Sequence, residues 1–403
     1  MNVRGGINVS FRDPRFLHRH IKSIISFYHP RCIDRDYGGY INQFRDDGTI
    51  FDRTTKHLVG TCRFIYNYSI ASAVLDEPEY REAAQHGLTF LKEVHRQSDG
   101  GFAWVLRGRE VHDATRHCYG HAFVLLAAAG ACKSGVEGAR EFLAEVFDLL
   151  EARFWQAGDG LYVDQIAPGD WSAIDPYRGQ NANMHMCEAM LSAFEATGGE
   201  EYLNRAHLLA KRICVNLAAR ADGLIWEHYR AGWIHDWEYN ADDPKNLFRP
   251  YGYLPGHFAE WAKLLLILER YRPEAWMVER ARGLFDVALA KSWDHERGGM
   301  HYTFAPDGRI LDTDRYYWVL SETFAAAALL ALRTDDPVYW DWYKKAWEFS
   351  DRYFVDHEYG GWYRILNEDN RKYDDLKSPT SKTDYHPLAA CYETLEALRR
   401  EGN

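Results

Sequence analysis

The sequence has no long apolar run and no cluster of basic residues. Its formal net charge is −11, so its surface potential disfavours binding to nucleic acid or to anionic lipid. No apolar stretch is long enough to cross a bilayer, and the first residues lack the apolar segment of a secretory signal. We therefore expect a cytoplasmic protein with neither a nucleic-acid nor a membrane partner.

Several motifs of known enzyme classes are also missing. There is no HExxH or cysteine cluster for zinc, no GxGxxG or GxxxxGKS/T for a nucleotide, and no GxSxG for a nucleophilic serine. The seven cysteines contain no CxxC pair, which favours reduced thiols. A zinc site stays open as an alternative, because His117 and His121 lie four residues apart. We expect no metal and no cofactor, which leaves proton transfer by histidine.

The sequence does contain a pattern that occurs six times, in which glycine precedes alternating aromatic or aliphatic residues. Such a pattern is typical of a tight turn that leads into a short strand. It recurs at intervals of 59 to 76 residues, at Gly39, Gly101, Gly160, Gly223, Gly299 and Gly361. Self-similarity of this length predicts a repeat architecture.

Two kinds of helical segment alternate between these turns. Amphipathic, charged segments precede the turns, at about 14–30, 78–97, 136–156, 200–219, 276–292 and 336–355. More apolar, Ala-rich segments follow them, at about 57–75, 116–132, 181–197, 256–271, 317–332 and 386–399. The first set fits an outer ring with one wet face, and the second fits a buried inner ring. We predict an all-α fold, an (α/α)6 barrel with short glycine-turn β-hairpins at one end, as a single catalytic domain over residues 1–403; an open solenoid is the alternative.

Each predicted inner helix carries polar or aromatic side chains in or just before its first turns. These are His57 and Arg63, Tyr119 and His121, Asn181 and His185, His257 and Glu260, Trp318 and Glu322, and His386. In a closed barrel these helix ends meet at one mouth, and such convergence is the default hypothesis for an active site.

Structural alternatives are open for several of these residues. Asn181 has the chemistry of a helix N-cap, Trp318 that of a core aromatic, and His121 that of a satisfied core histidine. His257 lies near a predicted helix N-terminus, whose dipole favours the neutral imidazole that a base requires. Glu260, three residues later, would oppose this effect and hold one tautomer of the ring.

The chain resembles the N-acylglucosamine 2-epimerase superfamily over nearly its full length, and its mannose (aldose–ketose) isomerase branch in particular. The segments that carry the resemblance are CRFIYNYS, YRGQNANMHMCEA, FRPYGYLPGHFAEW, YWVLSE and KTDYHP. It implies an (α/α)6 barrel that acts on free sugars without a metal. It also implies catalytic roles for His257 and His386 on opposite sides of the sugar, for Arg63 beside the enediolate oxygen, and for Glu260 as the support of His257.

The same resemblance assigns sugar contacts, at His185, Asn181, Tyr119, Trp318 and Glu322; His121 is a further candidate from its place in the second inner helix. We expect an isomerase that interconverts D-mannose and D-fructose through a cis-enediolate, as a monomer or a homodimer. The runner-up is a 2-epimerase that acts on mannose and glucose or on N-acylglucosamine. A glycoside hydrolase of the same fold, with paired carboxylates, and a non-catalytic sugar-binding protein are the rivals.

Overall fold

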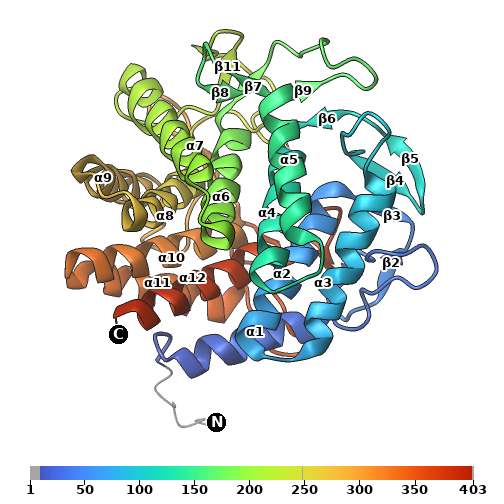
Figure 1. Cartoon of the computed structure of the whole chain (residues 1–403). Coiled ribbons are helices and arrows are strands. Elements are labelled where there is room, and N and C mark those ends of the chain that lie inside the picture. The colour runs from blue at the N-terminus through green and yellow to red at the C-terminus, as the bar shows by residue number, and fades with distance from the viewer. Residues whose placement is uncertain (1–9, 247, 402–403) are drawn as a thin grey trace.

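Twelve α-helices form two concentric rings within the residues that the computed structural model describes, 10–246 and 248–401 (Figure 1). The inner ring comprises α2 (Leu58–Leu75), α4 (Cys118–Lys133), α6 (Gln180–Thr197), α8 (Pro255–Tyr271), α10 (Tyr317–Thr334) and α12 (Tyr385–Glu401). The outer ring comprises α1 (Pro14–Tyr28), α3 (Pro78–Phe90), α5 (Ala139–Arg153), α7 (Glu200–Lys211), α9 (Ala275–Ser292) and α11 (Pro337–Tyr353).

The inner ring is closed, because each of its helices contacts the next and α12 contacts α2. This closure confirms the predicted (α/α)6 barrel and rules out the open solenoid. A single domain over residues 1–403 stays a prediction, and residues 1–9, 247, 402 and 403 of that range lie outside the described part of the chain.

Two outer segments end differently from the prediction. The helix α3 passes into a π-helical turn at Leu91–His95, and α7 passes into another at Arg212–Leu217, followed by a 3-10 turn at Ala218–Arg220. The predicted lengths are therefore right, but these segments are not α-helical throughout.

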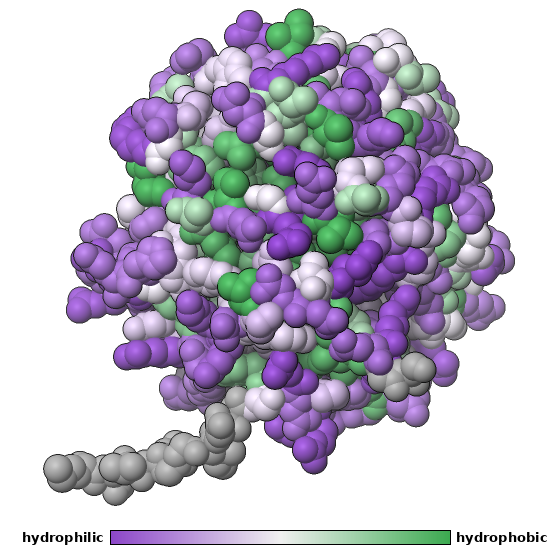
Figure 2. All heavy atoms as spheres, turned by 90° about the vertical axis from the view of Figure 1, so that its left-hand side faces the viewer, coloured by the Kyte–Doolittle hydropathy of each residue, from purple (hydrophilic) through white to green (hydrophobic). Residues whose placement is uncertain are grey.

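The two rings differ in burial as their sequences predict. In α8 every residue from Pro255 to Glu269 is buried, whereas α11 buries only one face. Figure 2 shows a face of the molecule on which hydrophilic side chains predominate and apolar ones lie between them. In the part of the chain that the structure describes, no helix combines the length and apolarity that a bilayer crossing needs.

Short antiparallel strands connect consecutive repeats. They are β1 (Gln43–Arg45), β2 (Ile50–Asp52), β3 (Thr55–His57), β4 (Val105–Arg107), β5 (Glu110–Asp113), β6 (Arg116–His117), β7 (Trp155–Gln156), β8 (Leu161–Tyr162), β9 (Gln165–Ile166), β10 (Arg178–Gly179), β11 (His228–Arg230), β12 (Ile234–His235), β13 (Thr303–Phe304), β14 (Ile310–Asp312), β15 (Arg315–Tyr316), β16 (Ile365–Leu366) and β17 (Leu376–Ser378). The predicted strand after each glycine is correct at β8. After Gly39, Gly101, Gly299 and Gly361 only a single bridge forms, and the prediction is wrong at Gly223, where residues 224–227 form neither a strand nor a bridge.

The strand before each inner helix pairs with the following repeat. The pairs are β3 with β4, β6 with β9, β10 with β11, and β15 with β16. Before α8, Tyr253 makes an isolated bridge to Phe304, and β17 pairs with β1 across the junction of the last and first repeats. The start of every inner helix is thereby held by its neighbour, which fixes the end of the barrel where the polar side chains lie.

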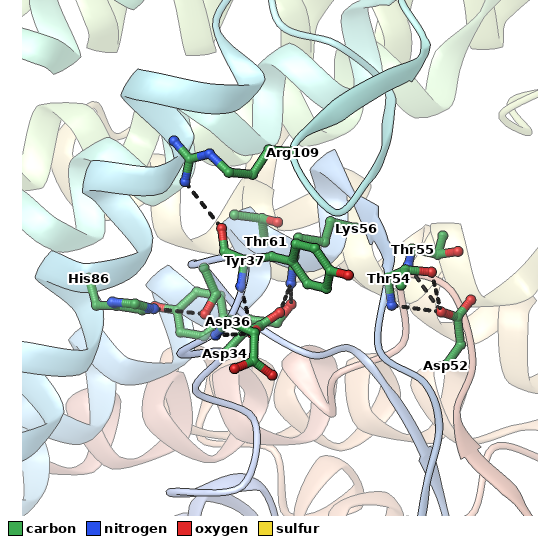
Figure 3. Close-up of polar contacts among 12 residues, drawn as sticks. Asp34, Asp36, Tyr37, Asp52, Thr54, Thr55, Lys56, Thr61, His86 and Arg109 are labelled. Atoms are coloured by element: carbon green, nitrogen blue, oxygen red, sulfur yellow. Dashed lines mark hydrogen bonds and ion pairs between the residues drawn. The ribbon is translucent and has the colours of Figure 1, made fainter.

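An ion pair whose cation is buried fastens several of the turns to these strands. Asp34 accepts backbone hydrogen bonds from Asp36 and Tyr37 and also binds Lys56 Nζ at 2.6 Å (Figure 3). The turn itself requires glycine, because φ of Gly39 is +64° and a Cβ there would lie 2.6 Å from Phe90. The same combination of turn aspartate and strand cation recurs as Asp99 with Arg116, Asp294 with Arg315 and Asp356 with Lys377. This pair is a part of the repeat that the glycine pattern does not reveal.

Replacing Lys56 with Met tests the contribution of this pair. Both side chains of the pair are buried, so the substitution leaves Asp34 charged and unpaired, and we expect a loss of about 3–5 kcal/mol in the free energy of unfolding, measured by denaturant titration. Lys22→Met is the control, because its pair with Glu77 has the same 2.6 Å separation but is exposed. Equal losses in the two variants would contradict a special role for the buried pair.

Candidate active site

A cavity of about 650 Å³ lies where the inner helices begin. Eight of the ten predicted site residues line it: Arg63, Tyr119, Asn181, His185, His257, Glu260, Trp318 and His386. They come from all six inner helices. The structure therefore brings these side chains together, while their roles remain predictions.

Three histidines of this cavity share one arrangement, in which Nδ1 lies against a carboxylate. Nδ1 of His257 is 3.0 Å from both oxygens of Glu227. Nδ1 of His386 is 2.7 Å from Glu322 Oε1, and Nδ1 of His185 is 2.9 Å from Glu188 Oε2. A carboxylate in this position accepts the Nδ1–H and selects the tautomer whose Nε2 is free to accept a proton.

The partner of His257 corrects one prediction. Glu227, and not Glu260, supports this imidazole. The Glu227 carboxylate is also held by the Gln180 amide, which donates to Oε2 at 2.9 Å, and Gln180 in turn accepts a hydrogen bond from Trp261 Nε1 at 2.7 Å. The available signal was the sequence ADGLIWEH, in which a glutamate follows the apolar residues of the fourth glycine turn.

His121 is a second correction, because it packs behind the cavity and not into it. Its Nε2 accepts the Phe102 backbone N–H at 3.2 Å, and its Nδ1 donates to the His117 carbonyl at 2.7 Å. Burial lowers the pKa of His121 to about 3. With both ring nitrogens bonded to backbone, this side chain is a neutral structural group, and the predicted sugar contact is wrong.

Glu322 lies beneath the cavity, and its contacts are with protein groups. Its Oε1 accepts from His386 Nδ1, and its Oε2 is 2.6 Å from Nζ of Lys263. Glu322 therefore supports His386 from below, and the predicted contact between Glu322 and the sugar is wrong. Lys263 was not singled out in the sequence, because it lies within the apolar run that follows Trp261.

Arg63 brings a positive charge into the cavity wall although it is almost fully buried. Its guanidinium donates to Tyr119 Oη at 3.1 Å and to the Ser381 carbonyl at 3.2 Å, and it lies 3.5 Å from His386 Nε2. Burial lowers the pKa of His386 well below its ordinary value, and the charge of Arg63 lowers it further. His386 is therefore neutral at physiological pH, which is the state a base requires.

Asn181 and Trp318 both face the cavity. Asn181 is the second residue of α6, whose N-cap is Gly179, so the capping alternative is wrong. The ring of Trp318 lies against both imidazoles, with centroid distances of 5.2 Å to His257 and 5.6 Å to His386. One indole therefore links the two histidines within a single cavity.

Two groups of side chains have the composition of a metal site, and they share Glu260. They are His185, Glu188 and Glu260, and Glu260, Glu322 and His386, each with possible ligand atoms within 4.8 Å of one another. The ammonium of Lys263 already supplies positive charge beside these carboxylates. The expectation of a site without metal therefore stays a prediction, and the carboxylates have an alternative counter-ion.

The chain matches the family model described as N-acylglucosamine 2-epimerase (GlcNAc 2-epimerase) over residues 39–390. The chain belongs to this family. It is 49% identical over 390 residues to the D-mannose isomerase of Marinomonas mediterranea, covering 96% of this chain and 98% of the relative. The chain is therefore an enzyme of the isomerase and epimerase type.

Solved structures agree with this membership. A crystal structure of D-mannose isomerase superposes with a TM-score of 0.94 at 48% identity, covering 96% of this chain and 99% of the other. The cellobiose 2-epimerase of Spirochaeta thermophila superposes with a TM-score of 0.85 at 22% identity, covering 97% and 98% of the two chains. At 22% identity, the second match shows that the two chains share a fold.

The protonation state of His386 can be measured directly. Because its pKa is well below that of an unfolded histidine, about 6.5, we expect 15N NMR at pH 6 to show a neutral ring protonated at Nδ1. As the pH falls below about 6.5, the unfolded chain gains a proton that the folded chain lacks, so this group makes folding less favourable toward acid pH. Glu322→Gln assigns the signal, and a doubly protonated ring in the wild type at pH 6 would contradict the geometry.

Proposed function

We propose that this protein interconverts D-mannose and D-fructose as an aldose–ketose isomerase. The observation that carries the proposal is a pair of histidine–carboxylate dyads, His257 with Glu227 and His386 with Glu322, whose imidazoles meet at one cavity beside Arg63. The relative that shares 49% of its residues over nearly the whole chain is a D-mannose isomerase, which supports mannose as the aldose.

The chemistry follows from the Nε2 atoms, which carry no proton in this tautomer; that of His386 lies 3.5 Å from the Arg63 guanidinium. After the sugar ring opens, one imidazole takes the proton from C2, and the electrons of that C–H bond form the C1–C2 double bond of an enediolate. Arg63 places positive charge beside the oxygen that becomes negative, which lowers the barrier electrostatically. A proton moves from O2 to O1, and return of a proton to C1 then gives the ketose, with the carboxylate of the dyad stabilising the transient imidazolium.

The second candidate is a 2-epimerase of the same family. Two imidazoles in one cavity also suit removal of the C2 proton from one face and its return from the other, and Trp318 contacts both rings.

A glycoside hydrolase needs two carboxyl groups free to flank a glycosidic bond. The candidates for that pair are Glu260 and Glu322. Here Glu322 is engaged by His386, and Glu227, the other glutamate of the described cavity lining, is engaged by His257, so Glu260 lacks a second free glutamate and the dyads argue against that rival. The cytoplasmic location and the monomeric or homodimeric state remain predictions.

Isotope labelling separates isomerisation from epimerisation. When mannose is incubated with the enzyme in D2O, we expect fructose that carries deuterium at C1, because the proton taken from C2 exchanges with the solvent on the imidazole before one is delivered to the neighbouring carbon. The products are identified by NMR. Glucose labelled at C2 as the sole product would support the epimerase instead.

Metal dependence is tested by including EDTA throughout. Activity that requires added divalent ions would disprove a site without metal.

Removing either imidazole tests the two dyads. We expect His257→Ala and His386→Ala each to lower kcat for mannose at least ~100-fold with the fold retained, since acid–base groups contribute on this scale. The control is His121→Gln, which removes a buried histidine outside the cavity and is expected to reduce stability more than kcat at 25 °C. Near-normal turnover in either cavity variant would remove that residue from the mechanism.

A further inference from the structure

The carboxyl group of Glu260 is buried at the cavity wall without a hydrogen-bond partner among the described residues. The residue is 1% exposed, and both carboxyl oxygens lack a donor. The nearest cationic candidate is His185 Nδ1, which is 3.7 Å from Glu260 Oε1 but only 2.9 Å from Glu188. An ionised carboxylate without a donor is costly in this position, which requires an explanation.

The donors that surround Glu260 are directed at other acceptors. From α8 itself, Lys263 binds Glu322, and from α12, Tyr385 donates to Glu188. From α2, Arg63 donates to Tyr119 and to the Ser381 carbonyl. The charges of Lys263 and Arg63 favour an ionised Glu260 from a distance, but no group of the described chain donates a hydrogen bond to its carboxyl oxygens.

The charges around Glu260 are already balanced without it. Two carboxylates that have partners of their own, Glu188 with His185 and Glu322 with Lys263, face it from α6 and α10, and two cations, Lys263 and Arg63, face it from α8 and α2. Burial raises the pKa of Glu322 as well, and the ammonium of Lys263 at 2.6 Å opposes that rise. His185 and His386 complete the surroundings, and burial lowers the pKa of both imidazoles, which keeps them neutral. Burial raises the pKa of Glu260 well above its ordinary value, and the charge of Glu322 raises it further.

We propose that Glu260 acts as a neutral carboxylic acid whose O–H donates a hydrogen bond to an oxygen of the bound sugar. The inference rests on the proposed function for the identity of the sugar. The group lines the cavity on the same helix as His257 and keeps its proton throughout, so no bond to that proton is broken. A fixed neutral donor and the cation of Arg63 would together stabilise the negative oxygen of the enediolate.

A comparison of amide substitutions tests this assignment. Gln at position 260 retains a neutral N–H donor, so we expect Glu260→Gln to keep kcat for mannose within about 10-fold of wild type, and Glu260→Ala to lose at least ~100-fold. The matched control is Glu227→Gln, which removes a carboxylate that must be charged to stabilise an imidazolium on His257, and it should lose at least ~100-fold. Equal loss in Glu260→Gln and Glu260→Ala would overturn the proposal.

A measurement that needs no turnover separates this inference from the proposed function. Burial raises the pKa of Asp164 and Asp384 to about 7, so both are ionised at pH 8.5. Burial also raises the pKa of Glu322 and Glu393, so the band is assigned by the difference between the wild type and Glu260→Gln. At that pH we expect the infrared spectrum of the wild type to contain a protonated-carboxyl band that is lost in Glu260→Gln. Only carboxylate bands, or a Gln variant less stable to heat than the Ala variant, would refute a neutral Glu260. The acid band together with no conversion of mannose would refute the isomerase and leave the neutral acid standing.

Discussion

A single buried ammonium group, that of Lys263, makes the polar interior of this barrel possible. Glu188, Glu260 and Glu322 come from three different inner helices, and the carboxyl group of Glu260 lies within 4.8 Å of each of the other two. Lys263 lies 2.6 Å from Glu322 and is itself 2% exposed. Burial alone would lower the pKa of Lys263, but the surrounding carboxylates raise it above its ordinary value, so the group stays charged. Without this charge the carboxylate beneath His386 would lose its counter-ion and its fixed position.

The three dyads show how differently a barrel can supply the same arrangement. Glu188 is three residues after His185 on one helix, Glu322 reaches His386 from the adjacent helix, and Glu227 reaches His257 from the residue before β11. The imidazoles thus occupy similar places while their partners do not. Orientation of a catalytic ring depends on such a partner, so the hairpin end of the barrel and the inner ring have to form together.

These origins explain how far the sequence could predict the structure. Hydrophobic period and glycine spacing locate the helices to within a few residues, because burial in a ring of helix pairs imposes that pattern directly. Spacing along one helix also exposes a pair such as His185 and Glu188. The same spacing gives the wrong partner for His257. Glu260 lies three residues later on the helix, but the imidazole contacts Glu227 from another segment. Partners from different helices are fixed by tertiary packing, which one sequence does not display.

The remaining errors have the same cause. His121 has the polarity of a site residue, but whether a histidine faces the cavity or bonds to the backbone of its own repeat depends on helix rotation. Lys263 is hidden in the sequence by its apolar neighbours, although its charge belongs to the site. Membership of the epimerase family limits the class of reaction to isomerisation or epimerisation. Which carboxylate supports which histidine, and which nitrogen carries the proton, follows from the geometry.

The pairing of β17 with β1 has a consequence for how this scaffold can diversify. Because the last repeat is joined edge to edge with the first, the bore of the ring is set by the number of helix pairs, and an additional pair would have to break that seam. The connecting segments around the rim, such as Asn246 and Phe248–Pro250, border the cavity without forming part of either ring, so changes in their length can reshape it without breaking the seam.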